Sequence, residues 1–119
     1  MSIFSWLIII LLVIFIINRF TPTKGVNNIT VQEAKDKLKD KQIQLIDVRT
    51  PGEYKTNHAK RFKNIPLAAL PKKINELDKG KETVVICQSG MRSARAAKIL
   101  KKQGFNQIYN VKGGMNAWY

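Results

Sequence analysis

The sequence begins with an apolar run, and this run is the feature that most constrains the fold. Of the first 17 residues 15 are apolar, and residues 1–18 carry no charged side chain. A helix of 17 residues is about 25 Å long at about 1.5 Å per residue. The hydrocarbon layer of a membrane is about 30 Å thick, so Asn18 and a snorkelling Arg19 would finish the span at the far interface. We therefore predict a transmembrane helix over residues 1–18.

The flanks of this run predict its orientation. A secretory signal peptide is one alternative, but no Lys or Arg precedes the run and no A-x-A-like cleavage site follows it. A buried helix is another. Positive residues gather on the C-terminal side, at Arg19, at Lys24 and between Lys35 and Lys41, and cytoplasmic flanks carry such an excess. We expect a single-pass protein of the cell membrane whose globular part faces the cytoplasm, with the membrane as its partner through residues 1–18.

The remaining 101 residues hold all 21 Lys and Arg and all 8 Asp and Glu, which give a net charge of +13. Residues 19–28 are polar and contain Pro22 and Gly25, so they are predicted to be a linker. Residues 29–119 leave room for one compact domain and not for two. Cys87 is the only cysteine, which excludes a disulfide within the chain and leaves this thiol structural, reactive or incidental.

Strand and helix patterns alternate through this domain. Helices are predicted to start at Thr30, where Glu33 completes a capping box, and at Thr50, and to cover Pro71–Lys79 and Met91–Gln103. Strands are predicted at Ile43–Val48, Thr83–Cys87 and Gln107–Val111, and a short segment ends the chain. This order is typical of an α/β domain with a mainly parallel central sheet flanked by helices.

Cys87 lies where a parallel sheet usually binds its ligand, directly after the clearest strand and before a helix. Residues 88–93 form a loop whose backbone N–H groups can point at one centre. The helix dipole and Arg92 are expected to favour the thiolate form that sulfur chemistry requires. The alternative is that Cys87 is a small buried apolar residue at a strand end.

The loop from Cys87 to Ser93, Cys-Gln-Ser-Gly-Met-Arg-Ser, resembles the active-site loop of the rhodanese family of sulfurtransferases. Three further stretches are similar in the same order: Leu45-Ile-Asp-Val-Arg49 followed by Glu53-Tyr54, then Asn64-Ile-Pro66, then Val111-Lys-Gly-Gly-Met-Asn-Ala-Trp118. The resemblance covers about Asn28 to the C-terminus. It implies a rhodanese-like domain at residues 29–119.

One segment departs from the family pattern. Where the family commonly has Gly-His-Ile-Pro-Gly-Ala, this chain has Asn57-His-Ala-Lys-Arg-Phe62, which keeps only His58. We expect a loop of altered shape and greater positive charge near the substrate entrance. A catalytic base is one interpretation of His58, and a hydrogen-bonded structural histidine is the favoured one.

The resemblance implies a membrane-anchored sulfurtransferase that moves sulfane sulfur through a Cys87 persulfide. The donor is a small anion such as thiosulfate, and the acceptor is cyanide or a thiol, which can belong to a protein. Cys87 is the expected catalytic residue, and the expected substrate-binding residues are Gln88, Ser89, Gly90, Met91, Arg92 and Ser93. Asp47 and Arg49 are expected to support the loop as an ion pair, or to be a purely structural pair. No cofactor and no metal is expected.

Two other functions stay open. A phosphatase or arsenate reductase would use Cys followed by five residues and Arg, whereas here Arg92 comes one position early and Ser93 takes that place. A non-enzymatic membrane-tethered binding module of the same fold is the other alternative. The charge of +13 can attract anionic donors, contact anionic lipids or solvate the surface. Nucleic acid is not an expected partner, because no basic motif interleaved with aromatic residues accompanies the lysines.

Overall fold

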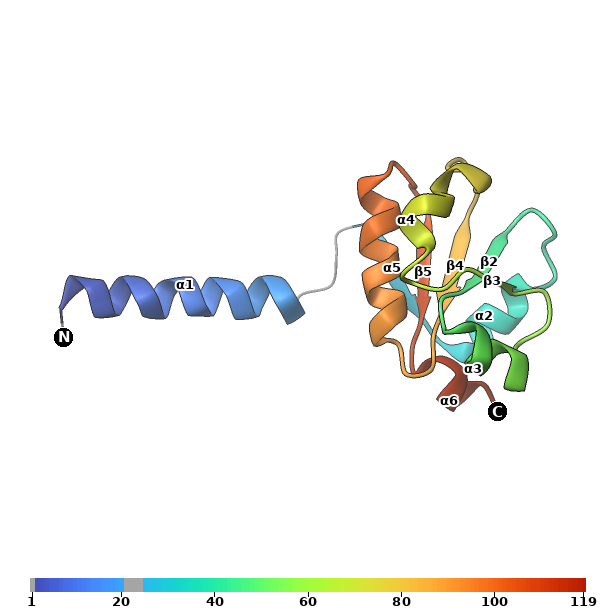
Figure 1. Ribbon diagram of the computed structural model, residues 1–119, viewed down its shortest axis with the longest axis horizontal. Coiled ribbons are helices and arrows are strands. Elements are labelled where there is room, and N and C mark those ends of the chain that lie inside the picture. Colours follow the sequence, from blue (N-terminus) through green and yellow to red (C-terminus); the bar gives the residue numbers. More distant parts are fainter. Residues whose placement is uncertain (1, 21–24) are drawn as a thin grey trace.

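A computed structural model describes residues 2–20 and 25–119 of the chain. Over residues 25–119 it contains a five-stranded parallel sheet in the order β1-β5-β4-β2-β3 (Figure 1). The strands are β1 (Val26–Ile29), β2 (Gln44–Asp47), β3 (Lys63–Asn64), β4 (Thr83–Ile86) and β5 (Ile108–Val111). The predicted α/β domain with a parallel central sheet flanked by helices is therefore confirmed.

The sheet has β4 at its centre, between β5 and β2. All four β4 residues are buried, as expected of a strand that is covered on both faces. Ile86 of β4 lies beside Asp47 of β2, and Val85 lies beside Asn110 of β5. The carboxyl ends of these three strands therefore meet at one edge of the sheet, on either side of the residue that follows β4.

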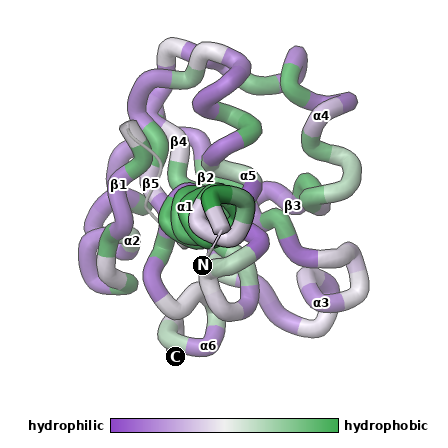
Figure 2. Tube along the Cα trace, turned by 90° about the vertical axis from the view of Figure 1, so that its left-hand side faces the viewer, coloured by the Kyte–Doolittle hydropathy of each residue, from purple (hydrophilic) through white to green (hydrophobic). Residues whose placement is uncertain are grey.

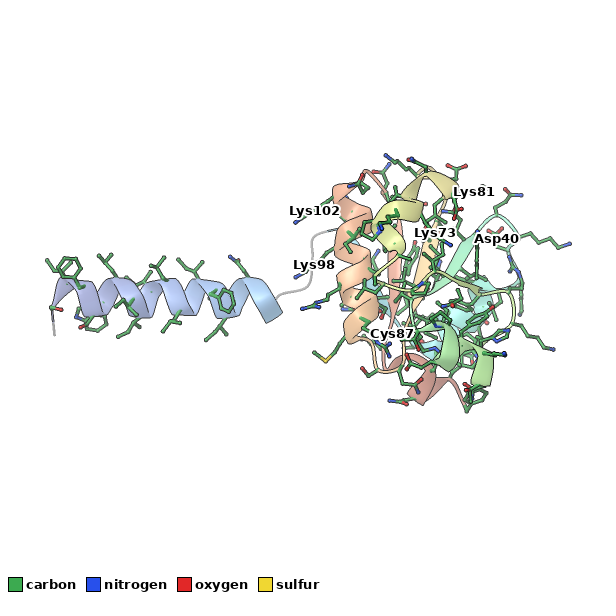
Figure 3. The ribbon with its side chains drawn as sticks, viewed as in Figure 1. Asp40, Lys73, Lys81, Cys87, Lys98 and Lys102 are labelled. Atoms are coloured by element: carbon green, nitrogen blue, oxygen red, sulfur yellow. The ribbon has the colours of Figure 1, made fainter. Side chains whose placement is uncertain are left out.

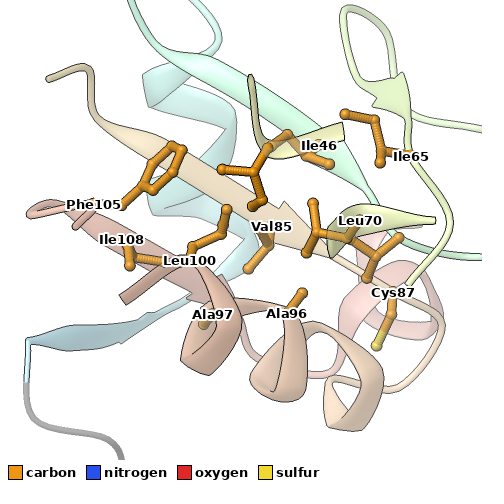
Figure 4. Packing of buried hydrophobic residues seen from close by; sticks show 12 residues of the cluster. Ile46, Ile65, Leu70, Val85, Cys87, Ala96, Ala97, Leu100, Phe105 and Ile108 are labelled. Atoms are coloured by element: carbon orange, nitrogen blue, oxygen red, sulfur yellow. The ribbon is translucent and has the colours of Figure 1, made fainter. Parts of the chain in front are cut away.

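Helices cover both faces of this sheet. The helices are α2 (Val31–Lys37), α3 (Pro51–Thr56), α4 (Leu70–Lys73), the 3-10 turn η1 (Ile74–Glu76), α5 (Met91–Lys102) and α6 (Gly114–Trp118). One core cluster joins alternate strand residues such as Ile46 and Val85 to Leu70 of α4 and Leu100 of α5 (Figure 4). The other cluster joins strand residues of the opposite face to α2 and α6, so the domain has three layers.

Two helices begin at the capping boxes indicated by the sequence. The Thr30 side chain accepts from the Glu33 backbone N–H while the Glu33 carboxylate accepts from Thr30. Thr50 and Glu53 make the same reciprocal pair at the start of α3, with Pro51 in its first turn. Both helix starts, and the strands predicted around β2, β4 and β5, are confirmed within a residue or two.

The helix predicted over Pro71–Lys79 is shorter in the structure, because α4 and η1 end at Glu76. Leu77 is extended, with φ −109° and ψ 152°. The Gln44 side chain explains this early end, since its Oε1 accepts from the Asp78 backbone N–H at 2.7 Å and its Nε2 donates to the Asp78 carbonyl at 2.8 Å. The side chain of Gln44 in β2 thus binds the backbone N–H and carbonyl of Asp78, which would otherwise be free to continue the helix.

The predicted linker of residues 19–28 also needs correction at its end. Val26 to Ile29 form the edge strand β1, paired with β5. The two asparagines in this strand are exposed and have low strand propensity, so the local sequence gives no signal. Pairing with β5 stabilises the strand instead. Residues 21–24 of the predicted linker lie outside the described residues.

The N-terminal run forms α1 (Ile3–Phe20), and Figure 2 shows this helix as mostly hydrophobic. Its large apolar side chains from Ile3 to Ile17 are exposed. Within the described part of the chain no helix is long and apolar enough to cross a membrane, so the predicted transmembrane helix over residues 1–18 is not supported. The 15 residues from Ile3 to Ile17 span about 22 Å, which is shorter than the hydrocarbon layer of about 30 Å. The side chain of Arg19, expected to finish the span, lies outside the described part.

Candidate active site

Cys87 follows β4 at the carboxyl edge of the sheet, and its side chain is fully buried. Figure 3 places it at the end of the domain where α6 lies, and Figure 4 shows it at one end of the core cluster, next to Leu70. The thiol therefore lies at the end of the core, directly after the central strand β4 and beside the loop of residues 88–90 that leads to α5.

Two hydrogen-bond donors of the loop reach the Cys87 sulfur. The Gly90 backbone N–H donates to Sγ at 2.9 Å, and the Ser93 hydroxyl lies 3.3 Å from Sγ. Gly90 has φ +107°, a left-handed conformation that side chains rarely adopt and that turns the loop into α5. The sulfur thus lies at the N-terminus of a 12-residue helix, whose dipole favours a negative charge there.

Arg92 does not stand free at the loop, because it pairs with Glu53 of α3. Its Nη1 donates to Oε1 at 2.6 Å and its Nη2 to Oε2 at 2.9 Å. The hydrogen bond from Arg92 lowers the pKa of Glu53 to about 2, against the opposing effect of burial. The same bond raises the pKa of Arg92 above its ordinary value. Glu53 was not among the predicted site residues, although it belongs to a motif that resembles the family.

Asp47 and Arg49 form the predicted ion pair, and both are almost completely buried. The Arg49 Nη2 lies 2.8 Å from the Asp47 Oδ2, and Nε contacts the same carboxylate. Nη1 of Arg49 donates to Oε1 of Gln88 at 3.2 Å, and Nη2 also donates to the Asn57 carbonyl. This pair therefore contacts the loop through Gln88 and the divergent segment through Asn57.

The start of α6 supports the loop from the other side. Backbone N–H groups of Met115 and Asn116 donate to the carbonyls of Cys87 and Gln88 at 2.8 and 3.0 Å. Gln88 Nε2 also donates to Asn116 Oδ1 at 2.6 Å. At Gly114 a Cβ atom would lie 2.2 Å from the Cys87 carbonyl oxygen, so only glycine allows this approach. Sequence reasoning found this motif but missed its contact with the loop.

The remaining predicted loop residues differ in their surroundings. Gln88 is held between Arg49 and Asn116, whereas Ser89 and Met91 are exposed.

Asn110 of β5 was not predicted, yet its Oδ1 lies 2.5 Å from the Ser93 hydroxyl. Its signal in the sequence is a polar residue in an otherwise apolar strand. Among the described residues no group of three or more His, Cys, Asp or Glu could hold a metal ion.

His58 is exposed and bonds the chain around it. Its Nδ1 lies 2.9 Å from the Tyr54 carbonyl oxygen, and its ring stacks on Tyr54 with centroids 3.9 Å apart. Tyr54 in turn donates to the Phe62 carbonyl, so this histidine and tyrosine hold the divergent segment of residues 57–62 to α3. The structural interpretation of His58 agrees with these contacts.

Comparison with known proteins gives concordant matches. Residues 30–119 match the family described as "Rhodanese-like domain". The "Uncharacterized protein YqhL" of Bacillus subtilis is 40% identical over 75% of this chain and 71% of its own length. The "Thiosulfate sulfurtransferase GlpE" of Vibrio cholerae serotype O1 is 30% identical over 77% of this chain and 87% of its own length. The crystal structure of a rhodanese-like domain protein from Staphylococcus aureus is similar with a TM-score of 0.73 and 35% identity, covering 78% of this chain and 91% of that one.

Proposed function

Because this chain belongs to the rhodanese-like domain family, we propose that it is a sulfurtransferase that carries sulfane sulfur as a persulfide on Cys87. The observation that carries the proposal is the environment of the sulfur. Two donors, the Gly90 N–H and the Ser93 hydroxyl, lie 2.9 and 3.3 Å from Sγ at a helix N-terminus. Such donors stabilise a thiolate, which is the nucleophilic form of cysteine.

In the first step the Cys87 thiolate attacks the outer sulfur of a donor such as thiosulfate. A bond forms between Sγ and that sulfur, while the sulfur–sulfur bond of the donor breaks and sulfite leaves with its electron pair. The cysteine then carries a persulfide whose negative charge lies on the added sulfur. Neither oxidant nor reductant is needed, because the donor supplies a sulfur atom that already has the required oxidation state.

In the second step an acceptor nucleophile attacks the added sulfur. A thiolate acceptor becomes a persulfide and cyanide becomes thiocyanate, and in both cases the electron pair of the broken bond returns to Cys87 as thiolate. The protein therefore ends the cycle unchanged. We expect small thiols and cysteines of partner proteins as acceptors, because the chain has no second cysteine of its own.

A small anionic donor fits the positive charge of the chain. The chain has a net charge of +13, which attracts anions. The relative from Vibrio cholerae is named a thiosulfate sulfurtransferase, and this name supports thiosulfate as the first donor to test. The proposal requires only the domain that begins with β1 at Val26. The cytoplasmic location expected from the flanking positive charges stays a prediction.

The test is the intact mass of the full chain after incubation with thiosulfate. The wild type should gain the mass of one sulfur atom, and added cyanide should remove it with formation of thiocyanate. Cys87→Ser should gain nothing, since Cys87 is the only cysteine. The proposal fails if the wild type forms no adduct, or if Cys87→Ser forms the same one. Hydrolysis of a phosphate monoester at a comparable rate would favour the phosphatase alternative.

A further inference from the structure

The Ser93 hydroxyl has one proton and three acceptors within reach. Its Oγ lies 2.5 Å from the Asn110 Oδ1, 3.1 Å from the Gly90 carbonyl oxygen and 3.3 Å from the Cys87 Sγ. A hydroxyl donates to one acceptor at full strength. Any bond that Ser93 makes to Asn110 is therefore lost when it donates to the sulfur.

The amide of Asn110 is held in the orientation that aims its oxygen at Ser93. Its Nδ2 donates to the Gly90 carbonyl oxygen at 3.3 Å and lies 3.2 Å from the Asn28 Oδ1 of β1. A carbonyl oxygen only accepts, so the nitrogen must face Gly90 and the oxygen must face Ser93. Asn110 is 7% exposed and Ser93 is fully buried, which keeps water from replacing either partner.

We propose that Asn110 is a positioning residue that shifts the balance at Cys87 from the thiolate toward the persulfide. In the thiolate the negative charge lies on Sγ, which then draws the Ser93 proton away from Asn110. In the persulfide the charge moves to the added sulfur and Sγ becomes a weak acceptor, so Ser93 returns to Asn110. The Asn110 oxygen thus stabilises the state that carries sulfur and opposes the free thiolate. The persulfide half of this inference depends on the function proposed above.

The hydrogen bonds of Ser93 and Asn110 given above involve no charged side chain of the elements around the loop. The charged groups near the loop come from several elements: Asp47 and Arg49 after β2, Glu53 on α3, Arg92 on α5, and the exposed Lys112 after β5. The first four are joined in two ion pairs. Asn110→Leu and Ser93→Ala leave all of these groups in place and add no charge, so a change at the sulfur in these variants can be assigned to the hydroxyl.

The first test measures the ultraviolet absorbance of the thiolate in the full chain as pH is raised, with the spectrum of Cys87→Ser subtracted. Asn110→Leu removes the nearer of the two acceptors that compete with the sulfur and leaves the Gly90 carbonyl, so it should raise the ratio of thiolate to thiol by up to about fivefold at a given pH, the equivalent of one neutral hydrogen bond. Asn110→Asp strengthens the acceptor but also adds a negative charge and removes the Nδ2 donor to Gly90, so it should lower this ratio. Only the part of this drop that depends on the Ser93 hydroxyl should disappear in a Ser93→Ala chain.

The control is the same pair of substitutions in a Ser93→Ala chain. Without the hydroxyl, Asn110→Leu should leave the ratio unchanged. The proposal is overturned if Asn110→Leu raises the ratio of thiolate to thiol equally in the wild-type and Ser93→Ala chains. It is also overturned if this substitution does not raise the ratio in the chain that keeps Ser93. This measurement needs no sulfur donor, so its outcome is independent of the proposed activity.

The second test measures the fraction of chains carrying a persulfide, by intact mass, at a fixed ratio of thiosulfate to sulfite. Asn110→Leu should reduce the ratio of persulfide to thiolate by up to about fivefold, the same factor with the opposite sense. An unchanged ratio in a variant whose thiolate ratio has risen would overturn the persulfide half of the proposal. If the wild type forms no persulfide at all, the proposed function fails while the result of the first test stands.

Discussion

Arg92 and Glu53 are joined by two hydrogen bonds, with Nη1 2.6 Å from Oε1 and Nη2 2.9 Å from Oε2. The arginine that would be expected to attract an anionic donor is therefore already paired with a carboxylate of α3. The same carboxylate accepts from the Thr50 backbone N–H at the start of α3. A single side chain thus links the cap of one helix to the loop that holds the sulfur.

Glu53→Gln should strengthen the binding of thiosulfate, because it leaves the Arg92 charge without its partner. We expect the KM for thiosulfate to fall about threefold, the scale of one part-exposed ion pair. Steady-state rates of thiocyanate formation measure this change. Glu76→Gln removes an equal charge from an exposed position in η1 and should leave the KM nearly unchanged. A higher KM in Glu53→Gln would show that the pair assists donor binding.

The Glu53–Arg92 pair should also make stability depend on pH in the acid range. The pKa of Glu53 is lowered from 4.5 to about 2 in the folded chain. A lowered pKa contributes stability that is present above pH 4.5 and is lost as pH falls toward 2. The side chains are about one third exposed, so solvent screening limits this contribution to about 1 kcal/mol. Urea unfolding of the wild type and Glu53→Gln should differ by this amount near pH 6 and converge near pH 2. A difference that is constant over this range would contradict the assignment.

Gly114→Ala should disrupt sulfur transfer through the backbone of the loop. The new Cβ would lie 2.2 Å from the Cys87 carbonyl oxygen, and Gly114 has φ +54°, so the loop and α6 must move apart. We expect kcat to fall at least about tenfold, since small misplacements of a reacting group are costly. Gly52→Ala is the matched control, because no atom lies within 4 Å of the added Cβ there. Equal activities of the two variants would show that the close approach is dispensable.

Arg49→Met should be strongly destabilising, because it leaves the fully buried Asp47 without its ion-pair partner. Breaking one side of such a pair costs about 3 to 5 kcal/mol. Urea unfolding at pH 7 measures the loss. In a chain that also carries Asp47→Asn the loss caused by Arg49→Met should be smaller, since no buried charge is left. Arg95→Met on the exposed side of α5 should cost little, and a similar loss there would mean that the effect is not specific to the buried pair.

The predicted elements that proved correct have strong local signals. The capping boxes at Thr30 and Thr50 and the apolar strand around Val85 mark their ends by chemistry within a few residues. The elements that were missed depend on distant partners. β1 exists because it pairs with β5, and the early end of η1 depends on the Gln44 side chain, more than 30 residues away in sequence.

The candidate site divides in the same way. The position of Cys87 after the central strand follows from the strand pattern alone. Gly90 contacts the sulfur through its backbone N–H, the kind of group expected of this loop, whereas Ser93 contacts it through its hydroxyl, which the sequence did not predict. Sequence reasoning assigned Arg92 to the substrate and could not find its bond to Glu53, because the two residues are 39 positions apart. Asn110 was missed for the same reason, since only the parallel packing of β5 beside β4 brings it to Ser93.

Cys87 is completely buried, so the sulfur that attacks the donor, Sγ, differs in exposure from the added sulfur that the acceptor takes away. A sulfur bonded to Sγ extends the side chain by about 2 Å, so the outermost atom of the loaded cysteine lies beyond the Sγ that the Gly90 N–H holds. Bulky reagents are kept from the resting thiol, whereas an acceptor needs to meet only the outermost atom of the loaded one. The loading step therefore calls for a small donor, whereas the unloading step takes place at an atom that the donor has added.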